Sequence, residues 1–152
     1  MHVVGVRRDP GAGANGADAV HGIADLDSLL PQADVVALTC ALTPETEKLI
    51  DGRRLALMKP SMHLVNVARG RCIDEAALTE ALTGRRIAGA ALDVFVEEPL
   101  PPSSALWGLG NIFITPHTGG ETRRYEENVI DILLDNLDRL WRREATLRNG
   151  IV

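Results

Sequence analysis

Three side chains with complementary chemistry follow three apolar segments of this sequence: Arg69 in NVARGRC, Glu98 in DVFVEEPLP and His117 in ITPHTGG. Arginine presents a planar fork that can bind a carboxylate through two hydrogen bonds. Histidine can transfer a proton near neutral pH, and a glutamate beside it favours the imidazolium and fixes the ring. Together, these residue types predict a reaction centre that binds a carboxylate and moves a proton.

Each of the three residues also has a simpler structural explanation when taken alone. Arg69 could pair with a surface carboxylate, Glu98 could belong to a solvated turn, and His117 could cap its own loop. A helix beginning after His117 would favour the neutral ring through its positive end, whereas Glu98 would favour the charged ring. The sequence leaves this balance open, and the case for a site depends on the three residues acting together.

Short apolar runs alternate with helical patterns along the chain, and these elements must position the three side chains. Strands are expected at 2–6, 33–39, 62–68, 87–95 and 111–116; helices are expected at 43–50, 51–60, 74–85 and 118–144, and 25–32 is expected to contain the end of a helix that Pro31 stops. Near-continuous apolar strands that alternate with helices predict an α/β fold with a parallel sheet and helices on both faces. Ligands bind such sheets beyond the carboxyl ends of the strands, which is where the three residues fall.

Several helix boundaries have specific signals. Thr43 can cap the helix at 43–50, with Pro44 in the first turn. Asp74 is expected to cap the helix at 74–85, which should stop at Gly84. The string TGGE predicts a capping box between Thr118 and Glu121 at the start of the last helix. The apolar residues of that helix recur at helical spacing and favour a core-facing stripe; they include Tyr125, Val129, Leu133, Leu137 and Trp141.

The string GAGANG at 11–16 matches the dinucleotide-binding pattern G-x-G-x-x-G letter for letter. A working fingerprint needs a strand that runs into the first glycine and a helix that opens at the last. Here RRDP separates the strand from Gly11, and the stretch after Gly16 has no sustained helical stripe. Asp34 has about the right spacing for the ribose-binding acid but begins a strand rather than ending one. We therefore interpret GAGANG as a surface loop.

Composition limits the class of protein and its partners. The chain has 152 residues, 45% of them hydrophobic and 24% charged, as in a soluble globular domain. Its net charge of -5 and the lack of a basic block argue against nucleic acid, and no apolar run is long enough for a membrane span. The two cysteines, Cys40 and Cys72, form neither a disulfide framework nor a metal site, so a cytoplasmic location is expected.

Four longer strings resemble the D-isomer-specific 2-hydroxyacid dehydrogenases: LTPETEKLI, NVARGRCIDEAAL, AGAALDVFVEEPLP and NIFITPHTGG. The resemblance runs from about His2 to the C-terminus. It implies a Rossmann-like NAD(P)-binding domain and hydride transfer between NAD or NADP and a small 2-oxo or 2-hydroxy acid. A homodimer is the expected form of the full-length protein.

The resemblance also assigns roles to individual residues. Arg69 is expected to hold the substrate carboxylate and carbonyl, His117 to be the acid–base, and Glu98 to be its partner. Asp93 is expected to contact the nicotinamide side of the cofactor. The positions that correspond to the family's cofactor cleft are Cys40, Ala41, Thr46, Val67, Ala68 and Gly119.

Cofactor preference is expected to depend on the end of the first strand. An acid there binds the ribose 2′-hydroxyl of NAD, whereas a nearby arginine accommodates the 2′-phosphate of NADP. The strand is followed by Arg7 and Arg8, with no acid before Asp9. NADP is therefore favoured slightly over NAD, although the two arginines could simply decorate a loop.

The sequence departs from the family pattern in two ways. Ala41 stands where the family usually has proline, which removes no functional group. The glycine fingerprint and the substrate domain that precede the second Rossmann strand in this family have no counterpart, and MHVVGV resembles that second strand. We therefore interpret residues 1–152 as a partial NAD(P)-binding domain that lacks the first βα unit and is inactive by itself.

Two other functions stay open at this point. The family includes corepressors that bind a nucleotide and recruit partners, so a non-enzymatic binding module is an alternative to an enzyme. A decayed remnant without function is a third. The presence of Arg69, Glu98 and His117 favours descent from a working enzyme but does not separate these alternatives.

Overall fold

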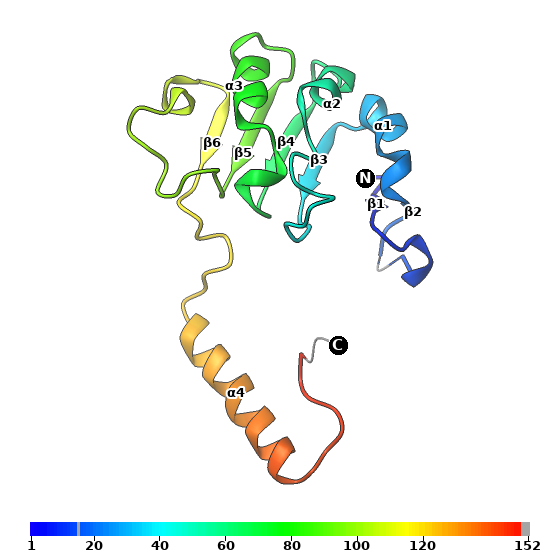
Figure 1. The fold of residues 1–152 in the computed structure, drawn as a ribbon, viewed down its shortest axis with the longest axis vertical. Helices are drawn as coiled ribbons and strands as arrows, with labels where there is room; N and C mark the ends of the chain where they lie inside the picture. The colour runs from blue at the N-terminus through cyan, green and yellow to red at the C-terminus, as the bar shows by residue number, and fades with distance from the viewer. Residues whose placement is uncertain (15, 150–152) are drawn as a thin grey trace. The chain divides into compact units, whose positions relative to one another are not determined.

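The computed structural model describes residues 1–14 and 16–149 and divides the chain into two compact units, Met1–Gly119 and Gly120–Val152. The first unit contains strands β1 (Val4–Val6), β2 (Ala19–His21), β3 (Val35–Leu38), β4 (His63–Asn66), β5 (Gly89–Leu92) and β6 (Ile112–Ile114). Its α-helices are α1 (Leu26–Leu29), α2 (Gly52–Leu57) and α3 (Glu75–Thr83), and the second unit contains α4 (Tyr125–Trp141) (Figure 1).

All described strands pair in parallel, but they form two sheets. A four-stranded sheet has the order β3-β4-β5-β6, and β1 and β2 form a separate pair. The parallel α/β class predicted from the sequence is confirmed. Five strands were expected and each is present, while β2 was not recognised because its three residues, Ala19–His21, carry no long apolar run.

The core lies on one face of the four-stranded sheet. Leu38, Leu64 and Leu92 point to this face and are almost fully buried beneath α2 and α3. Alternate side chains point to the other face, where Val35 is 60% exposed and Phe113 is 68% exposed. The helices described in the first unit therefore cover one face of this sheet and leave the other accessible.

The prediction that the first strand is buried is wrong. Val4 and Val6 of β1 are each 37% exposed, and β1 pairs only with β2 among the described residues. A continuous apolar run such as HVVGV is typical of a central strand of a parallel sheet, which has a neighbouring strand on each edge. Among the residues that the structure describes, no strand lies beside the other edge of β1.

The segment 43–50 forms a series of turns rather than the predicted helix. The hydroxyl of Thr46 accepts the main-chain N–H of Thr43 at 2.7 Å and donates to the carbonyl of Ala41 at 2.7 Å. The chain then runs beside the segment 71–74, with the N–H of Lys48 bonded to the carbonyl of Arg71. These long-range bonds replace the helical ones, so a correct capping pattern did not lead to a helix.

The helix α3 follows its cap as predicted, and α2 has a cap that was not singled out from the sequence. Asp74 accepts the N–H of Ala77, and α3 ends at Gly84. Asp51 caps α2 in the same way, and that helix ends before Pro60. Both helices therefore begin at an aspartate whose side chain satisfies a free N–H of the first turn.

The last helix starts later than predicted, and the capping box is wrong. The N–H of Thr118 bonds to Asp93 instead, and α4 begins at Tyr125 without a side-chain cap. Within the second unit no residue of α4 is buried, and the core-facing stripe stays a prediction. Among the described helices, none combines the length and the apolar character that crossing a bilayer requires.

Candidate active site

The predicted catalytic residues lie at one edge of the four-stranded sheet. Arg69 comes three residues after β4, Glu98 lies in the loop that follows β5, and His117 comes three residues after β6. Because the strands are parallel, their carboxyl ends meet at the same edge, where ligands bind in open α/β sheets. The structure thus brings together three residues that are 48 positions apart from first to last.

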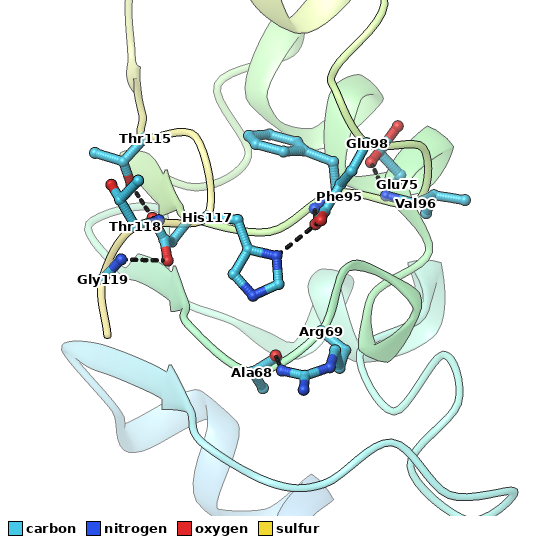
Figure 2. A network of polar contacts seen from close by, with 11 residues as sticks. Ala68, Arg69, Glu75, Phe95, Val96, Glu98, Thr115, His117, Thr118 and Gly119 are labelled. Carbon is cyan, nitrogen blue, oxygen red and sulfur yellow. Dashed lines mark hydrogen bonds and ion pairs between the residues drawn. The ribbon is translucent and has the colours of Figure 1, made fainter. Parts of the chain in front are cut away.

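His117 and Glu98 are in direct contact. The Nδ1 atom of His117 lies 2.8 Å from Oε2 of Glu98, while Oε1 of Glu98 accepts the N–H of Phe95 at 2.8 Å (Figure 2). His117 has a φ of 58°, in the left-handed region that few residues other than glycine adopt. The unusual backbone directs the ring back toward the loop after β5, and both oxygens of the glutamate are engaged.

The surroundings of Glu98 favour its charged form. Burial raises the pKa of Glu98, but the hydrogen bond from His117, the N–H of Phe95 and the positive charge of Arg69 together bring this pKa below its usual value. The glutamate is therefore ionised near neutral pH and presents a negative charge to the imidazole. Such a partner stabilises a protonated ring, as a proton donor requires.

Arg69 is held by the loop that follows β4. Asn66, which is 1% exposed, donates to the carbonyl of Arg69 at 3.0 Å and accepts the N–H of Ala68 at 3.0 Å. The guanidinium donates to the carbonyl of Ala68 at 2.6 Å (Figure 2). Asn66 is a positioning residue that the sequence reasoning missed. A polar residue inside the apolar run MHLVNVA was the signal that could have identified it.

The loops that carry Arg69 and Glu98 are packed backbone to backbone. A Cβ added to Gly70 would lie 1.9 Å from the carbonyl carbon of Phe95, which leaves no room for any side chain. The N–H of Val96 also donates to Glu75 at the start of α3. The glycine that follows Arg69 therefore sets how closely the two loops approach.

Asp93 fixes the loop that carries His117. Its carboxylate accepts the hydroxyl of Thr115, the N–H of Thr118 at 3.0 Å and the N–H of Gly119 at 2.9 Å. The pKa of Asp93 is lowered, chiefly by the hydrogen bond from the Thr115 hydroxyl. Burial of the carboxylate raises this pKa, whereas the two N–H groups and the charge of His117 lower it further. Both carboxylate oxygens of Asp93, which was expected to contact the cofactor, thus accept hydrogen bonds from the chain's own backbone and hydroxyl groups. Thr115 was not singled out from the sequence.

Gly119 lies against the same carboxylate. A Cβ at this position would lie 2.8 Å from Oδ2 of Asp93, so the close N–H contact requires glycine. The loop from Thr115 to Gly119 is consequently tied to β5 at both of its ends. His117 is the middle residue of this five-residue loop.

A second feature of the first unit is a groove of about 1330 Å³ between the two sheets. The expected cofactor residues Arg7, Arg8, Cys40, Ala41 and Thr46 line it. Val67 and Ala68 lie after β4, where Val67 is 50% exposed and Ala68 is buried. None of Arg69, Glu98 and His117 lines the groove. Both the groove and this cluster include residues that follow the carboxyl ends of strands.

The two arginines already have protein partners. Arg7 donates to the carbonyl of Gly13 at 3.1 Å, and Arg8 lies 3.7 Å from the carboxylate of Glu45. Both contacts are at the surface, where such bonds exchange readily for a ligand. The pair Arg8–Glu45 joins the loop after β1 to the turn series after β3.

GAGANG is part of the connection between β1 and β2. A short 3₁₀ helix, Pro10–Ala12, covers its first two residues, and Asn15 lies outside the described residues. Gly13 and Gly16 have φ values of 92° and 89°, and β2 follows three residues after Gly16. No helix opens at the last glycine, which confirms the interpretation of this string as a loop.

Comparison with known proteins identifies the family of the chain. The model of the NAD binding domain of the D-isomer specific 2-hydroxyacid dehydrogenases matches residues 1–119. The chain belongs to this family. It is 48% identical over 113 residues to a glyoxylate/hydroxypyruvate reductase B of Pectobacterium carotovorum, covering 74% of this chain and 35% of the relative. It is 46% identical over 114 residues to an (S)-sulfolactate dehydrogenase of Chromohalobacter salexigens, covering 75% of this chain and 37% of that relative.

Solved structures of the 2-hydroxyacid dehydrogenase family share the fold. A family member from Xanthobacter autotrophicus, solved with NADPH and MES, is 35% identical with a TM-score of 0.84, over 100% of this chain and 61% of the other. One from Aeromonas salmonicida is 37% identical with a TM-score of 0.88, over 100% and 48%. The Rossmann-like class is confirmed, and the chain spans about a third of the length of the curated relatives it matches.

The described residues fit part of a dinucleotide. The groove places two guanidinium groups at the end of β1, which suits a phosphate on the adenosine ribose. A pyrophosphate usually binds the N-terminus of a helix that directly follows a strand, and the described residues that line the groove include no such strand-to-helix turn. The described lining of the groove therefore combines two cationic side chains at the end of β1 with no helix N-terminus that directly follows a strand.

Proposed function

We propose that the chain is the part of an NAD(P)-dependent 2-hydroxyacid dehydrogenase that carries the acid–base residue, and that the whole protein reduces a short 2-oxo acid. The observation that carries this proposal is the 2.8 Å contact between Nδ1 of His117 and Glu98, beside Arg69 at the carboxyl ends of the strands. The names of the relatives support the substrate class, since they include glyoxylate, hydroxypyruvate and sulfolactate.

Each residue has one task in the proposed reaction. Arg69 binds the substrate carboxylate and orients the neighbouring carbonyl. Because Nδ1 of His117 faces Glu98, Nε2 is the ring nitrogen that can donate a proton to the carbonyl oxygen. Glu98 stabilises the charged ring before the transfer and holds its orientation afterwards. The reduced nicotinamide, when bound, supplies the hydride.

The intact 2-hydroxyacid dehydrogenase is proposed to favour NADP(H). Arg7 and Arg8 line the groove, and the carboxylate that could bind a ribose hydroxyl in their place, Asp9, instead caps the following 3₁₀ helix by accepting the N–H of Gly11. The homodimer and the cytoplasmic location expected from the sequence belong to the same proposal.

A non-enzymatic binding module is the alternative. It would use the same groove but would have no need of a histidine paired with an ionised glutamate. We favour the enzyme because three independent features converge on His117: its left-handed backbone, the Glu98 contact and the Asp93 bonds at the two ends of its loop.

A chimera tests the proposal. This chain replaces the matched segment of the Pectobacterium reductase, and NADPH oxidation is followed with glyoxylate and hydroxypyruvate. We expect turnover that His117→Ala lowers by about 100-fold or more, the usual contribution of a general acid. His63→Ala is the control, because His63 is an exposed residue at the start of β4. A folded chimera that binds NADPH without turnover, or a His117→Ala chimera with full turnover, would contradict the assignment.

A further inference from the structure

Two successive N–H groups in the loop after β5 each donate to a glutamate (Figure 2). The N–H of Phe95 donates to Oε1 of Glu98 at 2.8 Å, and the N–H of Val96 donates to Glu75 at 3.1 Å. The first bond lies within the loop, whereas the second reaches 21 positions back, to the first residue of α3. Only Glu98 has a task in the proposed reaction, and the role of Glu75 is unassigned.

The peptide group that joins Phe95 to Val96 is restrained by two other segments. Its N–H is bound by Glu75, and because a peptide group is planar, this bond also fixes the direction of the Phe95 carbonyl. A Cβ built on Gly70 would lie 1.9 Å from the carbonyl carbon of Phe95 and 2.4 Å from the nitrogen of Val96. Gly70 therefore sets how near this peptide comes to the loop after β4, and Glu75 restrains its rotation.

Glu75 is not needed to cap the helix that it begins. Asp74 precedes it and accepts the N–H of Ala77, so the start of α3 already has a side-chain cap. A glutamate in the first turn also stabilises a helix through the negative charge that it places near the N-terminus. That contribution needs a charge but no particular contact, whereas the bond to Val96 needs an acceptor oxygen at one place. Substitution can therefore separate the two roles.

We propose that Glu75 is a positioning residue that acts on His117 through Glu98. By holding the N–H of Val96, Glu75 fixes the peptide that follows Phe95, so the N–H of Phe95 stays directed at Oε1 of Glu98. With Oε1 engaged there, Oε2 of Glu98 faces Nδ1 of His117. The catalytic consequence rests on the proposed function, whereas the restraint on Glu98 rests on contacts within this chain.

The ionisation of Glu98 reports this restraint without any turnover. Burial raises the pKa of Glu98, whereas the bonds from His117 and Phe95 and the charge of Arg69 bring it below its usual value. Removing Glu75 frees the peptide after Phe95, so the charged carboxylate of Glu98 loses part of its stabilisation. Because hydrogen bonds to the charged form lower a carboxyl pKa, the pKa of Glu98 should rise.

NMR on the 152-residue chain tests the restraint. Glu75→Ala should raise the pKa of Glu98 and speed the hydrogen exchange of the Val96 amide, whose residue is 52% exposed. Glu75→Gln keeps an acceptor oxygen and should stay close to the wild type in both measurements. Glu80→Ala is the matched control and should change neither, because Glu80 is an exposed glutamate of the same helix that lies 3.8 Å from Arg86.

A second variant removes the donor and leaves Glu75 in place. Replacing Val96 with the α-hydroxy acid that has the same side chain exchanges the N–H for an ester oxygen, so the start of α3 is untouched. The ester should raise the pKa of Glu98 as Glu75→Ala does. Combining the two changes should add little, as expected for the two partners of one hydrogen bond.

The reductase chimera measures the catalytic consequence. Glu75→Ala should lower kcat by about tenfold and change KM less, because Arg69 still binds the substrate carboxylate. It should also move the alkaline limb of the kcat/KM profile to lower pH, since the protonated ring of His117 loses its fixed anionic partner. A smaller folded fraction would lower the whole profile without moving it. Glu75→Gln should restore the profile, and Glu80→Ala should leave it unchanged.

Several outcomes would overturn the proposal. They are a pKa of Glu98 that Glu75→Ala leaves unchanged, a pH profile that does not move, and additive effects of Glu75→Ala and the Val96 ester. Equal damage by Glu75→Gln and Glu75→Ala would also overturn it and would assign Glu75 to the charge at the start of α3. A chimera whose turnover does not depend on His117 would contradict the proposed function alone, because the measurements on the chain decide the restraint on Glu98.

Discussion

Oε2 of Glu98 lies 2.8 Å from Nδ1 of His117, and Oε1 of the same carboxylate accepts the N–H of Phe95 at 2.8 Å. One side chain therefore connects the loop after β5 to the imidazole on the loop after β6. The link means that the charge of Glu98 and the position of the ring cannot be changed separately. The first prediction follows from this coupling.

Replacing Glu98 with glutamine should alter the pH dependence of the reductase chimera. Without the carboxylate, the protonated ring loses the negative charge that faces it, and the alkaline limb of the kcat/KM profile for reduction should move to lower pH. Profiles of the wild-type and Glu98→Gln chimeras measure this. Glu97→Gln is the control, because Glu97 is exposed and next in sequence. A Glu98→Gln profile that coincides with the wild type would contradict the role of Glu98.

Adding a methyl group to Gly70 should destabilise the fold. The new Cβ would lie 1.9 Å from the Phe95 carbonyl carbon, so the two loops must separate, at a cost of about 1–3 kcal/mol. Urea unfolding of the Gly70→Ala chain measures the change. Gly22→Ala should alter stability by less than about 0.5 kcal/mol, because nothing lies within 4 Å of its Cβ position and its φ is -77°. Equal effects of the two substitutions would argue against the close approach.

Acid should unfold the chain partly through Asp27. The hydrogen bond from Arg53, with that from Arg54, lowers the pKa of Asp27 from 3.8 to about 2. Since the folded pKa is below the unfolded one, the stabilisation is complete above pH 3.8 and is lost as pH falls toward 2. Carboxyl NMR should give a midpoint of about 2 for Asp27, and Asp27→Asn should lose less stability over that interval. A midpoint near 3.8 would remove the basis of this prediction.

Two arginines should set the cofactor preference of the chimera. We expect a higher kcat/KM with NADPH than with NADH, and we expect the double variant Arg7→Ser/Arg8→Ser to lower the NADPH value by about tenfold or more. The NADH value should change much less, because the ribose of NAD carries no 2′-phosphate. Arg123→Ser, an exposed site near the boundary of the two units, is the control. Preference for NADH in the unmodified chimera would refute the assignment.

The 152-residue chain alone should not turn over substrate. Among the described residues, the groove has no helix N-terminus for a pyrophosphate, and His117 is exposed over 47% of its side chain. We expect no oxidation of NADPH or NADH with glyoxylate, pyruvate or hydroxypyruvate. Steady turnover that His117→Ala abolishes would show that these residues suffice.

Short sequence patterns correctly predicted those helices and strands whose boundaries are set by side chains within or next to the element. The helix α3 begins and ends where Asp74 and Gly84 indicate, and the strands β3 to β6 coincide with apolar runs. The segment 43–50 has an equally good local pattern, Thr43 followed by proline, yet it forms turns. Its main-chain groups bond to residues 71–74, and no pattern within eight residues contains that information.

In the candidate site, too, some residues could be predicted from the sequence and others could not. Arg69, Glu98 and His117 could be singled out because each follows a predicted strand and their chemical types complement one another, and the structure confirms that His117 contacts Glu98. The residues that position them could not. Thr118 was interpreted as a helix cap, although its N–H binds Asp93, because hydrogen bonds between distant strands leave no periodic trace in the sequence.

The separation of the two sheets has a consequence for how such enzymes can change over evolution. The loops that carry Arg69, Glu98 and His117 follow β4, β5 and β6, respectively, and the register of these strands is set within the four-stranded sheet. The arginines of the groove follow β1, which belongs to the other sheet. Recombination between related genes could therefore exchange the part proposed to select the nucleotide while the geometry proposed for proton transfer is inherited unchanged. Such an exchange would let one lineage acquire a new electron donor without rebuilding its chemistry.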